Sequence, residues 1–312
     1  MFRTFALAVA AALAAAPALA DWQPSGPIKL MIAFRAGGGA DTQARLIAEG
    51  IEAKRGWKII PENVTGKGGV VLAQQLKDEP ADGLTIAMAV TETLSYNRLA
   101  QRDPGFAPED FTLLTATAGS QMAVVATADK GWKTLGDVIA AAKAGESVSF
   151  GAMSPKLADG AYLIGKANGV DFNIVGGLKG GRGVMNALTA GDVDVGWGAG
   201  IQTAGVVAGD LVNLASAEGA PLNASPDAPL LEEFGVPYLF GATFVMFAPA
   251  GLPDEARAAL TEAIVEVVED PQSKANAFIT RAFSLKVVAG ADLEAQVAQE
   301  NADAEAILDA AQ

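Results

Sequence analysis

The chain of 312 residues contains no cysteine and no histidine. Without cysteine it has no disulfide framework, no thiolate chemistry and no site for lipid attachment behind a signal peptide. Without histidine it lacks the commonest general base and the commonest zinc ligand, and a Ser-His-Asp relay is excluded. We therefore predict no catalytic residue, no metal site and no cofactor.

Positive charge is also scarce in this sequence. The chain has 22 lysines and arginines against 36 aspartates and glutamates, which gives a formal net charge of −14 at pH 7. Such a charge repels nucleic acid and anionic lipid surfaces overall, so we expect no nucleic-acid partner. A small anion can still bind where local donors outweigh the global field, and such a site should be a pocket with concentrated donors.

The first 20 residues have the features of a secretory signal peptide. They carry one positive charge at Arg3, then an uncharged apolar stretch, and they end in the small-residue sequence Ala18-Leu19-Ala20. The apolar stretch is shorter than the roughly 20 residues that span a bilayer, which disfavours the alternative of a membrane anchor. We therefore predict export and cleavage before Asp21.

After this segment, apolar runs of strand length alternate with amphipathic segments of helix length. We expect strands at residues 28–34, 58–61, 84–90, 122–126, 147–151, 172–175, 192–197 and 242–248, and helices at 42–55, 70–77, 135–143, 161–168, 184–190, around 256–267 and after 292. The alternation predicts an α/β fold with parallel sheets and helices on both faces. The alternation of strands and helices occurs once in each half of the chain. The chain then ends on helices after a late strand, which fits a return to the first domain. We therefore expect one domain of residues 21–123 with about 242–312, and a second of residues 124–241.

The first predicted helix has suitable residues at both ends. We expect Asp41 as its N-cap, although direct contact with a ligand is an alternative role for this side chain. Lys54 and Arg55 suit the negative end of the helix dipole, and Gly56 can take the left-handed conformation just beyond the helix.

Three glycine-containing loops each follow a predicted strand and precede a predicted helix, at residues 36–41, 153–159 and 176–183, and a fourth at 65–69 has the same place. In open parallel sheets, ligands bind at the carboxyl ends of the strands, where helix N-termini offer free amide groups and partial positive charge. Several such loops together predict a cleft that binds a carboxylate. The alternative for any single loop is a tight turn without a ligand.

Charged and aromatic residues beside these loops are further candidates. Arg35, Lys179 and Arg182 can form charge-assisted bonds to a carboxylate or extend into solvent. Phe34 and Trp197 lie at strand ends, where they form either the wall of a pocket or part of the core.

Five segments, in their order and spacing, resemble the extracytoplasmic solute receptors of the tripartite tricarboxylate transporter system, the TctC or Bug family. They are "PIKLMIAFRAGGGADTQARLIAEGI", "ENVTGKGGVVLAQQLKDEPADGLTIAM", "GLKGGRGVMNALTAGDVDV", "PDAPLLEEFGV" and "FAPAGLPDEARAAL". The resemblance implies a two-domain periplasmic-binding-protein fold of type II-like architecture, with parallel or mixed sheets, flanking helices and a ligand cleft between the domains.

Carried over by position, the resemblance implies one ligand loop at residues 34–41 and another at 153–156. The remaining lining is implied around Thr91 and Asn97, at 179–181 and at 196–198. The implied binding residues are Phe34, Arg35, Ala36, Gly37, Gly38, Gly39, Asp41, Thr91, Asn97, Met153, Ser154, Pro155, Lys156, Lys179, Gly180, Gly181, Gly196, Trp197 and Gly198. The chain departs from the family at Ala36, where proline is usual, and in "GGLKGG" and "AMSPKLADG". These departures concern the identity of the ligand more than the fold.

The expected function is that of a periplasmic receptor, monomeric, that captures a small organic mono-, di- or tricarboxylate and delivers it to the membrane permease subunits of a tripartite tricarboxylate-type transporter. Two alternatives stay open. One is a sensory co-receptor that presents its ligand to a membrane kinase. The other is an exported enzyme that acts on carboxylates, which the lack of histidine and of a G-x-S-x-G motif disfavours.

Overall fold

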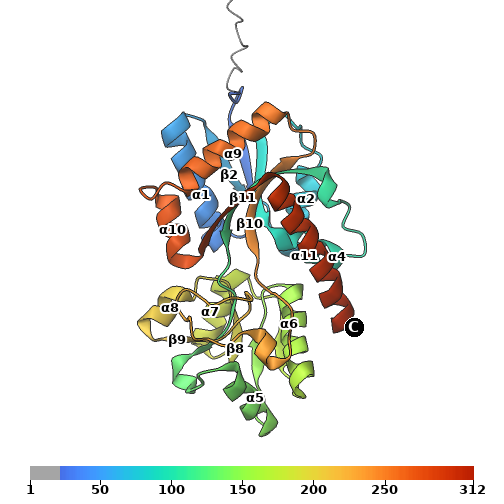
Figure 1. The fold of residues 1–312 in the computed structure, drawn as a ribbon, viewed down its shortest axis with the longest axis vertical. Helices are drawn as coiled ribbons and strands as arrows, with labels where there is room; N and C mark the ends of the chain where they lie inside the picture. The colour runs from blue at the N-terminus through green and yellow to red at the C-terminus, as the bar shows by residue number, and fades with distance from the viewer. Residues whose placement is uncertain (1–21) are drawn as a thin grey trace, which may run out of the picture.

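The computed structural model describes residues 22–312, so the predicted signal peptide at residues 1–20 and the cleavage site before Asp21 lie outside the described residues. The described chain forms two lobes, each built on one β-sheet with helices packed against it (Figure 1). No helix within residues 22–312 combines the length and the apolar character needed to cross a membrane.

The first lobe contains a mixed six-stranded sheet in the order β11-β4-β10-β3-β1-β2. Its strands are β1 Ile28–Ile32, β2 Ile59–Asn63, β3 Thr85–Val90, β4 Phe111–Gly119, β10 Thr243–Pro249 and β11 Ser284–Ala289. Strand β1 pairs in parallel with β2 and β3, whereas the pairs β10–β3, β10–β4 and β11–β4 are antiparallel. Strand β3 is buried along its whole length, as expected for a central strand with both faces covered.

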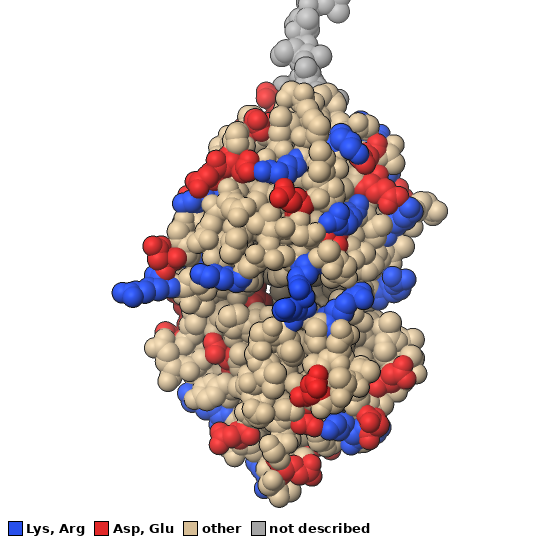
Figure 2. All heavy atoms as spheres, turned by 180° about the vertical axis from the view of Figure 1, so that it is seen from behind, with Lys and Arg blue, Asp and Glu red and all other residues tan. Residues whose placement is uncertain are grey.

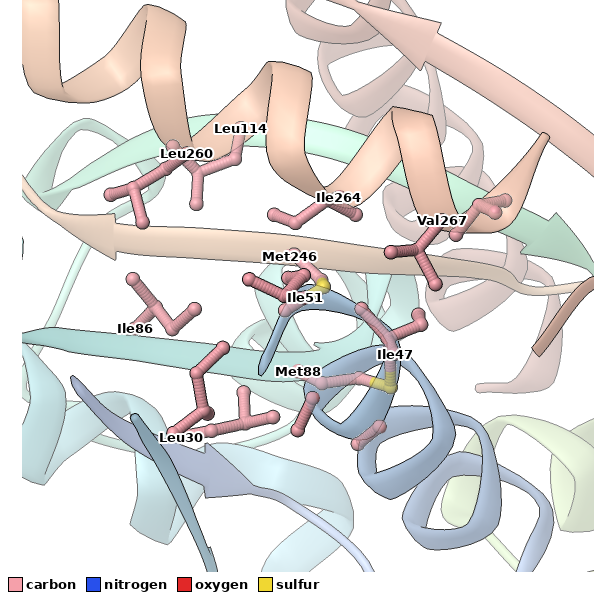
Figure 3. Packing of buried hydrophobic residues seen from close by; sticks show 14 of the residues in the cluster. Leu30, Ile47, Ile51, Ile86, Met88, Leu114, Met246, Leu260, Ile264 and Val267 are labelled. Atoms are coloured by element: carbon pink, nitrogen blue, oxygen red, sulfur yellow. The ribbon is translucent and has the colours of Figure 1, made fainter. Parts of the chain in front are cut away.

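Helices cover both faces of this sheet. One face packs against helices α1 Gly39–Arg55, α9 Asp254–Val268 and α10 Lys274–Ala282, and the other against α2 Val70–Leu76 and the first half of α11 Gly290–Ala311. Successive residues of β1 belong to opposite faces, so Leu30 packs under α1 and Met31 under α2. Figure 3 shows Ile47 of α1 and Ile264 of α9 meeting Met246 and other side chains of the sheet. Gly56 ends α1 with φ 71°, as predicted.

The second lobe contains a five-stranded sheet in the order β7-β6-β8-β5-β9. Its strands are β5 Ala123–Thr127, β6 Ser149–Gly151, β7 Asn173–Val175, β8 Val195–Gly198 and β9 Leu211–Ser216, and its helices are α5 Leu135–Lys143, α6 Pro155–Asn168, α7 Gly180–Ala190 and α8 Thr203–Ala208. Strand β6 pairs in parallel with β7 and β8, and β5 pairs antiparallel with β8 and β9.

Three parts of the chain join the lobes. The polypeptide crosses once between β4 and β5 and returns just before β10. Helix α11 runs from the first lobe to the second, where Ala304 and Ile307 enter the core (Figure 1). The short helices α3 Thr91–Leu94 and α4 Tyr96–Leu99 lie at the same junction, and the Tyr96 hydroxyl donates to Asp159 of α6.

The predicted fold class is confirmed, but several predicted boundaries are wrong. Helix α1 begins at Gly39 instead of 42, α6 at Pro155 instead of 161, and α7 at Gly180 instead of 184. Glycine and proline are tolerated in the first helical turn, where the amide groups need no partner within the helix. Strands β4, β9 and β11 were not predicted from the periodicity. The domain boundaries at 123/124 and 241/242 stay a prediction, which the distribution of strands between the two sheets supports.

Candidate functional site

A cavity of about 400 Å³ lies between the two lobes. Its walls come from the segments that follow β1 and β3, from the starts of α6 and α7, and from the segments that connect the lobes. The view in Figure 2 shows lysine and arginine side chains gathered at the waist between the lobes. The lining includes four cationic side chains and one carboxylate, namely Arg35, Lys67, Lys179, Arg182 and Glu92.

The loop after β1 brings the N-terminus of α1 to the cavity. Gly38 occupies the N-cap position in extended backbone, with φ −77° and ψ 172°, and no described side chain caps this helix end. Gly38, Gly39 and Ala40 all line the cavity. A Cβ at Gly39 would lie 2.7 Å from Cζ of Phe283, so glycine is required for this close approach. The amide groups and positive dipole end of α1 therefore border the space available to an anion.

Asp41 is not the N-cap that the sequence predicts, because the helix has already begun at Gly39. Its side chain is buried and turned away from the cavity lining. It accepts hydrogen bonds from the Gly37 amide at 2.8 Å, from Asn63 Nδ2 at 2.7 Å and from Arg45 Nε at 2.9 Å. Burial alone would raise the pKa of Asp41, but the bonds from Asn63, Gly37 and Arg45 outweigh it and lower that pKa. Through its bond from the Gly37 amide, Asp41 thus fixes the glycine loop without itself lining the cavity.

The loop before α2 forms a second wall of the first lobe. Gly68 has φ +66°, and a Cβ there would lie 2.2 Å from Nδ2 of Asn97, so this position requires glycine. The Gly68 carbonyl accepts from Asn97 Nδ2 at 3.1 Å and from Thr93 Oγ1 at 2.8 Å. These bonds fix residues 65–68 against α3 and α4 and place the Asn97 side chain at the cavity.

Two helix N-termini of the second lobe face the same cavity. Ser154 is the N-cap of α6, its Oγ accepting from the Leu157 amide at 3.4 Å, and Pro155 takes the first helical position. Lys179 precedes the first residue of α7, and no described side chain caps that end. Met153, Ser154 and residues 178–182 line the cavity. Helices α1, α6 and α7 therefore direct their positive ends toward one cavity from both lobes.

Ten of the predicted binding residues line the cavity. They are Phe34, Arg35, Gly38, Gly39, Asn97, Met153, Ser154, Lys179, Gly180 and Gly181. Arg35, Lys179 and Arg182, for which two roles were open, all contribute to this lining and are also exposed. The other nine predicted residues lie outside the lining: Ala36, Gly37, Asp41, Thr91, Pro155, Lys156, Gly196, Trp197 and Gly198.

Trp197 illustrates why some of these residues lie elsewhere. Its side chain is fully buried in the core of the second lobe, 5.3 Å from the Phe150 ring and 5.4 Å from the Phe240 ring between centroids. Its Nε1 donates to the Leu157 carbonyl at 2.6 Å. Of the two roles left open for Trp197, the structure therefore supports the core. Lys156 points away as well, with Nζ 3.5 Å from the Gly241 carbonyl oxygen.

The cavity also contains residues that the sequence analysis did not identify. Phe244 and Phe283 form a T-shaped pair with centroids 4.8 Å apart, and Ser120 and Met122 come from the crossing segment after β4. No local sequence pattern identifies these four residues. Ser120 and Met122 could have been expected at the cavity only from their place in the segment that crosses between the two predicted domains. Glu92, Thr65 and Lys67 also line the cavity and are absent from the predicted binding residues, although Thr65 and Lys67 belong to one of the four glycine-containing loops. Within residues 22–312, acidic side chains do not gather in the groups of three that a metal site would require.

Comparisons with known proteins give a consistent picture. A family model described as "Tripartite tricarboxylate transporter family receptor" matches residues 43–310. The UPF0065 protein in the gbd 5' region of Cupriavidus necator is 30% identical over 281 residues, which cover 85% of this chain and 82% of that protein.

Solved structures share the fold. A protein of R. palustris whose structure was determined with adipate has a TM-score of 0.81 and 23% identity, covering 92% of this chain and 98% of that chain. MatC from Rhodopseudomonas palustris, with bound malate, has a TM-score of 0.77 and 23% identity, covering 91% of this chain and 99% of that chain. At these identities the likeness establishes the fold alone.

Proposed function

The chain belongs to the tripartite tricarboxylate transporter receptor family, and on that premise we propose that it is a periplasmic receptor for a small organic carboxylate. The ligand is captured in the cavity between the lobes and delivered to the membrane permease subunits of a tripartite tricarboxylate-type transporter. We further propose that the protein acts as a monomer and performs no catalysis on its ligand.

The convergence of three helix N-termini on one cavity carries this proposal. Helices α1, α6 and α7 approach from both lobes, and the four cationic side chains of the lining add positive charge. Each helix dipole stabilises an adjacent anion by roughly 0.3 to 1 kcal/mol, and more where the site is partly buried. A carboxylate held in this way gains charge-assisted bonds from backbone and side chains without any metal. Because the chain as a whole is negatively charged, it repels anions overall. A local concentration of hydrogen-bond donors and positive charge is therefore specific evidence that this cavity binds an anion.

The two-lobed architecture supports capture by closure. The cavity-lining residues divide between the lobes, with Gly38 and Gly39 on one side and Ser154 and Lys179 on the other. A ligand that contacts both sides stabilises the conformation in which the lobes are close, because only there are all contacts made. The adipate and malate found in two neighbours of the same fold are both dicarboxylates, which supports this class of ligand.

Calorimetric titration with adipate, malate, succinate and citrate tests the proposal, using protein freed of co-purified ligand by unfolding, dialysis and refolding. We expect at least one of these anions to bind and to raise the melting temperature, since binding to the native state alone stabilises it. Lys179→Glu should weaken that binding at least tenfold. The matched control is Arg102→Glu, which makes the same charge change at an exposed residue outside the cavity lining. Failure of every carboxylate to bind would contradict the proposal.

A further inference from the structure

The cationic side chains that line the cavity between the lobes form neither an ion pair nor a side-chain hydrogen bond with any residue in 22–312. They are Arg35, Lys67, Lys179 and Arg182, called the rim cations below. All four are exposed. Carboxylates are abundant in this chain, because 36 acidic residues outnumber 22 basic ones. The cavity is therefore a place where positive charge gathers without the counter-charges that the rest of the surface offers.

The rim cations are divided equally between the two lobes. Arg35 follows β1 and Lys67 precedes α2, so both belong to the first lobe. Lys179 and Arg182 lie at the start of α7 in the second lobe. Figure 2 shows lysine and arginine side chains on both sides of the hollow at the waist. Positive charge on one lobe therefore faces positive charge on the other.

The lining contains little negative charge to offset this arrangement. Glu92 is its only carboxylate within residues 22–312, against the four rim cations. Its side chain is only 5% exposed and forms no ion pair with any of them. The N-termini of α1, α6 and α7 add further partial charges of the positive sign. Without a ligand, the two walls of the cavity repel each other.

The size of the cavity makes this repulsion effective in physiological salt. The cavity has a volume of about 400 Å³. A sphere of that volume is about 9 Å across, which is close to the Debye length of roughly 8 Å at physiological ionic strength. Charges on opposite walls are then only partly screened, and their repulsion grows as the lobes approach. A bound anion reverses the balance, because it attracts the cations of both walls at once.

We infer that the rim cations hold the lobes apart in the ligand-free protein, and that the negative charge of the bound carboxylate releases the lobes to close. This inference rests on the proposed function and describes how its site is regulated. Closure then requires neutralisation of charge as well as a fitting shape. A neutral molecule that fits the cavity leaves the repulsion in place and does not favour the closed conformation.

Pulsed electron paramagnetic resonance on ligand-free protein tests this inference through the distance between the lobes. Because the chain has no cysteine, Ala53→Cys and Ala190→Cys introduce the only labelling sites, both exposed and one on each lobe. Ligand is removed by unfolding, dialysis and refolding. Distances are compared at roughly 10 mM salt, where the Debye length is about 30 Å, and at roughly 1 M salt, where it is about 3 Å. We expect the wild-type background to shift toward shorter distances at high salt, because screening weakens the repulsion.

Charge reversal on one lobe should invert this salt response. In Lys179→Glu/Arg182→Glu the lobes attract each other, so at low salt the population of the shorter distance should at least double relative to the wild-type background, and high salt should lengthen the distance. Arg35→Glu/Lys67→Glu makes the same change from the other lobe, so the result does not depend on one variant. The control Lys133→Glu/Lys143→Glu makes an equal charge change at exposed residues of the second lobe outside the lining, and it should behave like the wild-type background.

The effect of a ligand completes the test. Adding whichever of adipate, malate, succinate or citrate binds in calorimetry should shift the wild-type background to the shorter distance at low salt. Distances that do not respond to salt, or reversed variants that match the control, would overturn the inference. These measurements are made without any carboxylate, so either result would leave the proposed function intact. Failure of every carboxylate to bind in calorimetry would instead contradict the proposed function, whatever the ligand-free distances show.

Discussion

Glu218 should make the stability of the protein depend on pH between about 4.5 and 6. Its Oε1 accepts from Ser120 Oγ and from the Met122 amide, both at 2.6 Å, in the segment that crosses between the lobes. Ser120 is bonded in turn to the returning segment, since its Oγ accepts from the Ala242 amide at 2.8 Å. The carboxyl group of Glu218 thus lies where the two crossing segments meet.

Burial is the main influence on this group. It raises the pKa of Glu218 from 4.5 to about 6, although the bonds from Ser120 and Met122 and the charges of Lys156 and Lys286 act in the opposite direction. The folded protein therefore holds this proton more tightly than the unfolded chain. The resulting stabilisation is fully present below pH 4.5 and is lost as the pH rises through about 6. The difference between the two pKa values corresponds to about 2 kcal/mol of unfolding free energy.

Urea unfolding, followed by circular dichroism at several pH values from 4.5 to 7.5, measures this contribution in Glu218→Gln. Glutamine keeps an acceptor oxygen for Ser120 and Met122 but does not titrate. Relative to wild type, the variant should gain about 2 kcal/mol of unfolding free energy between pH 4.5 and 7. Other carboxyl groups titrate alike in both proteins, so the difference isolates Glu218. The control is Glu146→Gln, which removes an exposed carboxyl group outside the crossing segments and should not reproduce this gain. Parallel curves for Glu218→Gln and wild type would refute the reasoning.

Two further predictions concern the loop after β1 and the core of the second lobe. Gly38→Val should lower carboxylate affinity at least tenfold in calorimetry, because the valine side chain would occupy the cavity beside the N-terminus of α1. The control Gly26→Val, in open space before β1, should leave the affinity unchanged. If Gly38→Val bound the carboxylate as tightly as wild type, the loop would be an ordinary turn without a role in binding. Trp197→Ala should lower the free energy of unfolding by about 3 to 5 kcal/mol in urea titrations, because a fully buried indole and its bond to the Leu157 carbonyl are lost, and a loss below about 1 kcal/mol would contradict the packing described for it.

Much of the fold is predictable from local features. Apolar runs of strand length, amphipathic helices and glycine punctuation repeat along the chain, and they correctly predict which loops border the cavity. The helix starts were placed too late because Gly39, Pro155 and Gly180 were interpreted as loop residues. Ser154 followed by Pro155 is in fact a good helix start, since serine caps the first amides and proline lacks the amide that has no partner there.

The direction of a side chain at a strand end was not predictable in the same way. Strand β8 alternates its residues between the two faces of its sheet, and no residue of this strand borders the cavity; Val195 and Trp197 share the face that belongs to the core. Trp197 therefore enters the core beside Phe150. Phe283 belongs to the cavity for a comparable reason, since the end of α10 packs beside Gly39 although the two lie far apart in the sequence.

The cavity residues that local sequence predicts and those that it does not predict make different kinds of contact with a ligand. The helix N-termini of α1, α6 and α7 supply backbone donors whose position follows from strand–loop–helix connections, which local sequence specifies. Such donors attract any carboxylate and discriminate little between them. Discrimination requires side chains that reach the cavity from distant parts of the chain, such as Phe244 and Phe283. A chain can therefore retain its recognisable loops while a single substitution at such a position changes which carboxylate it selects.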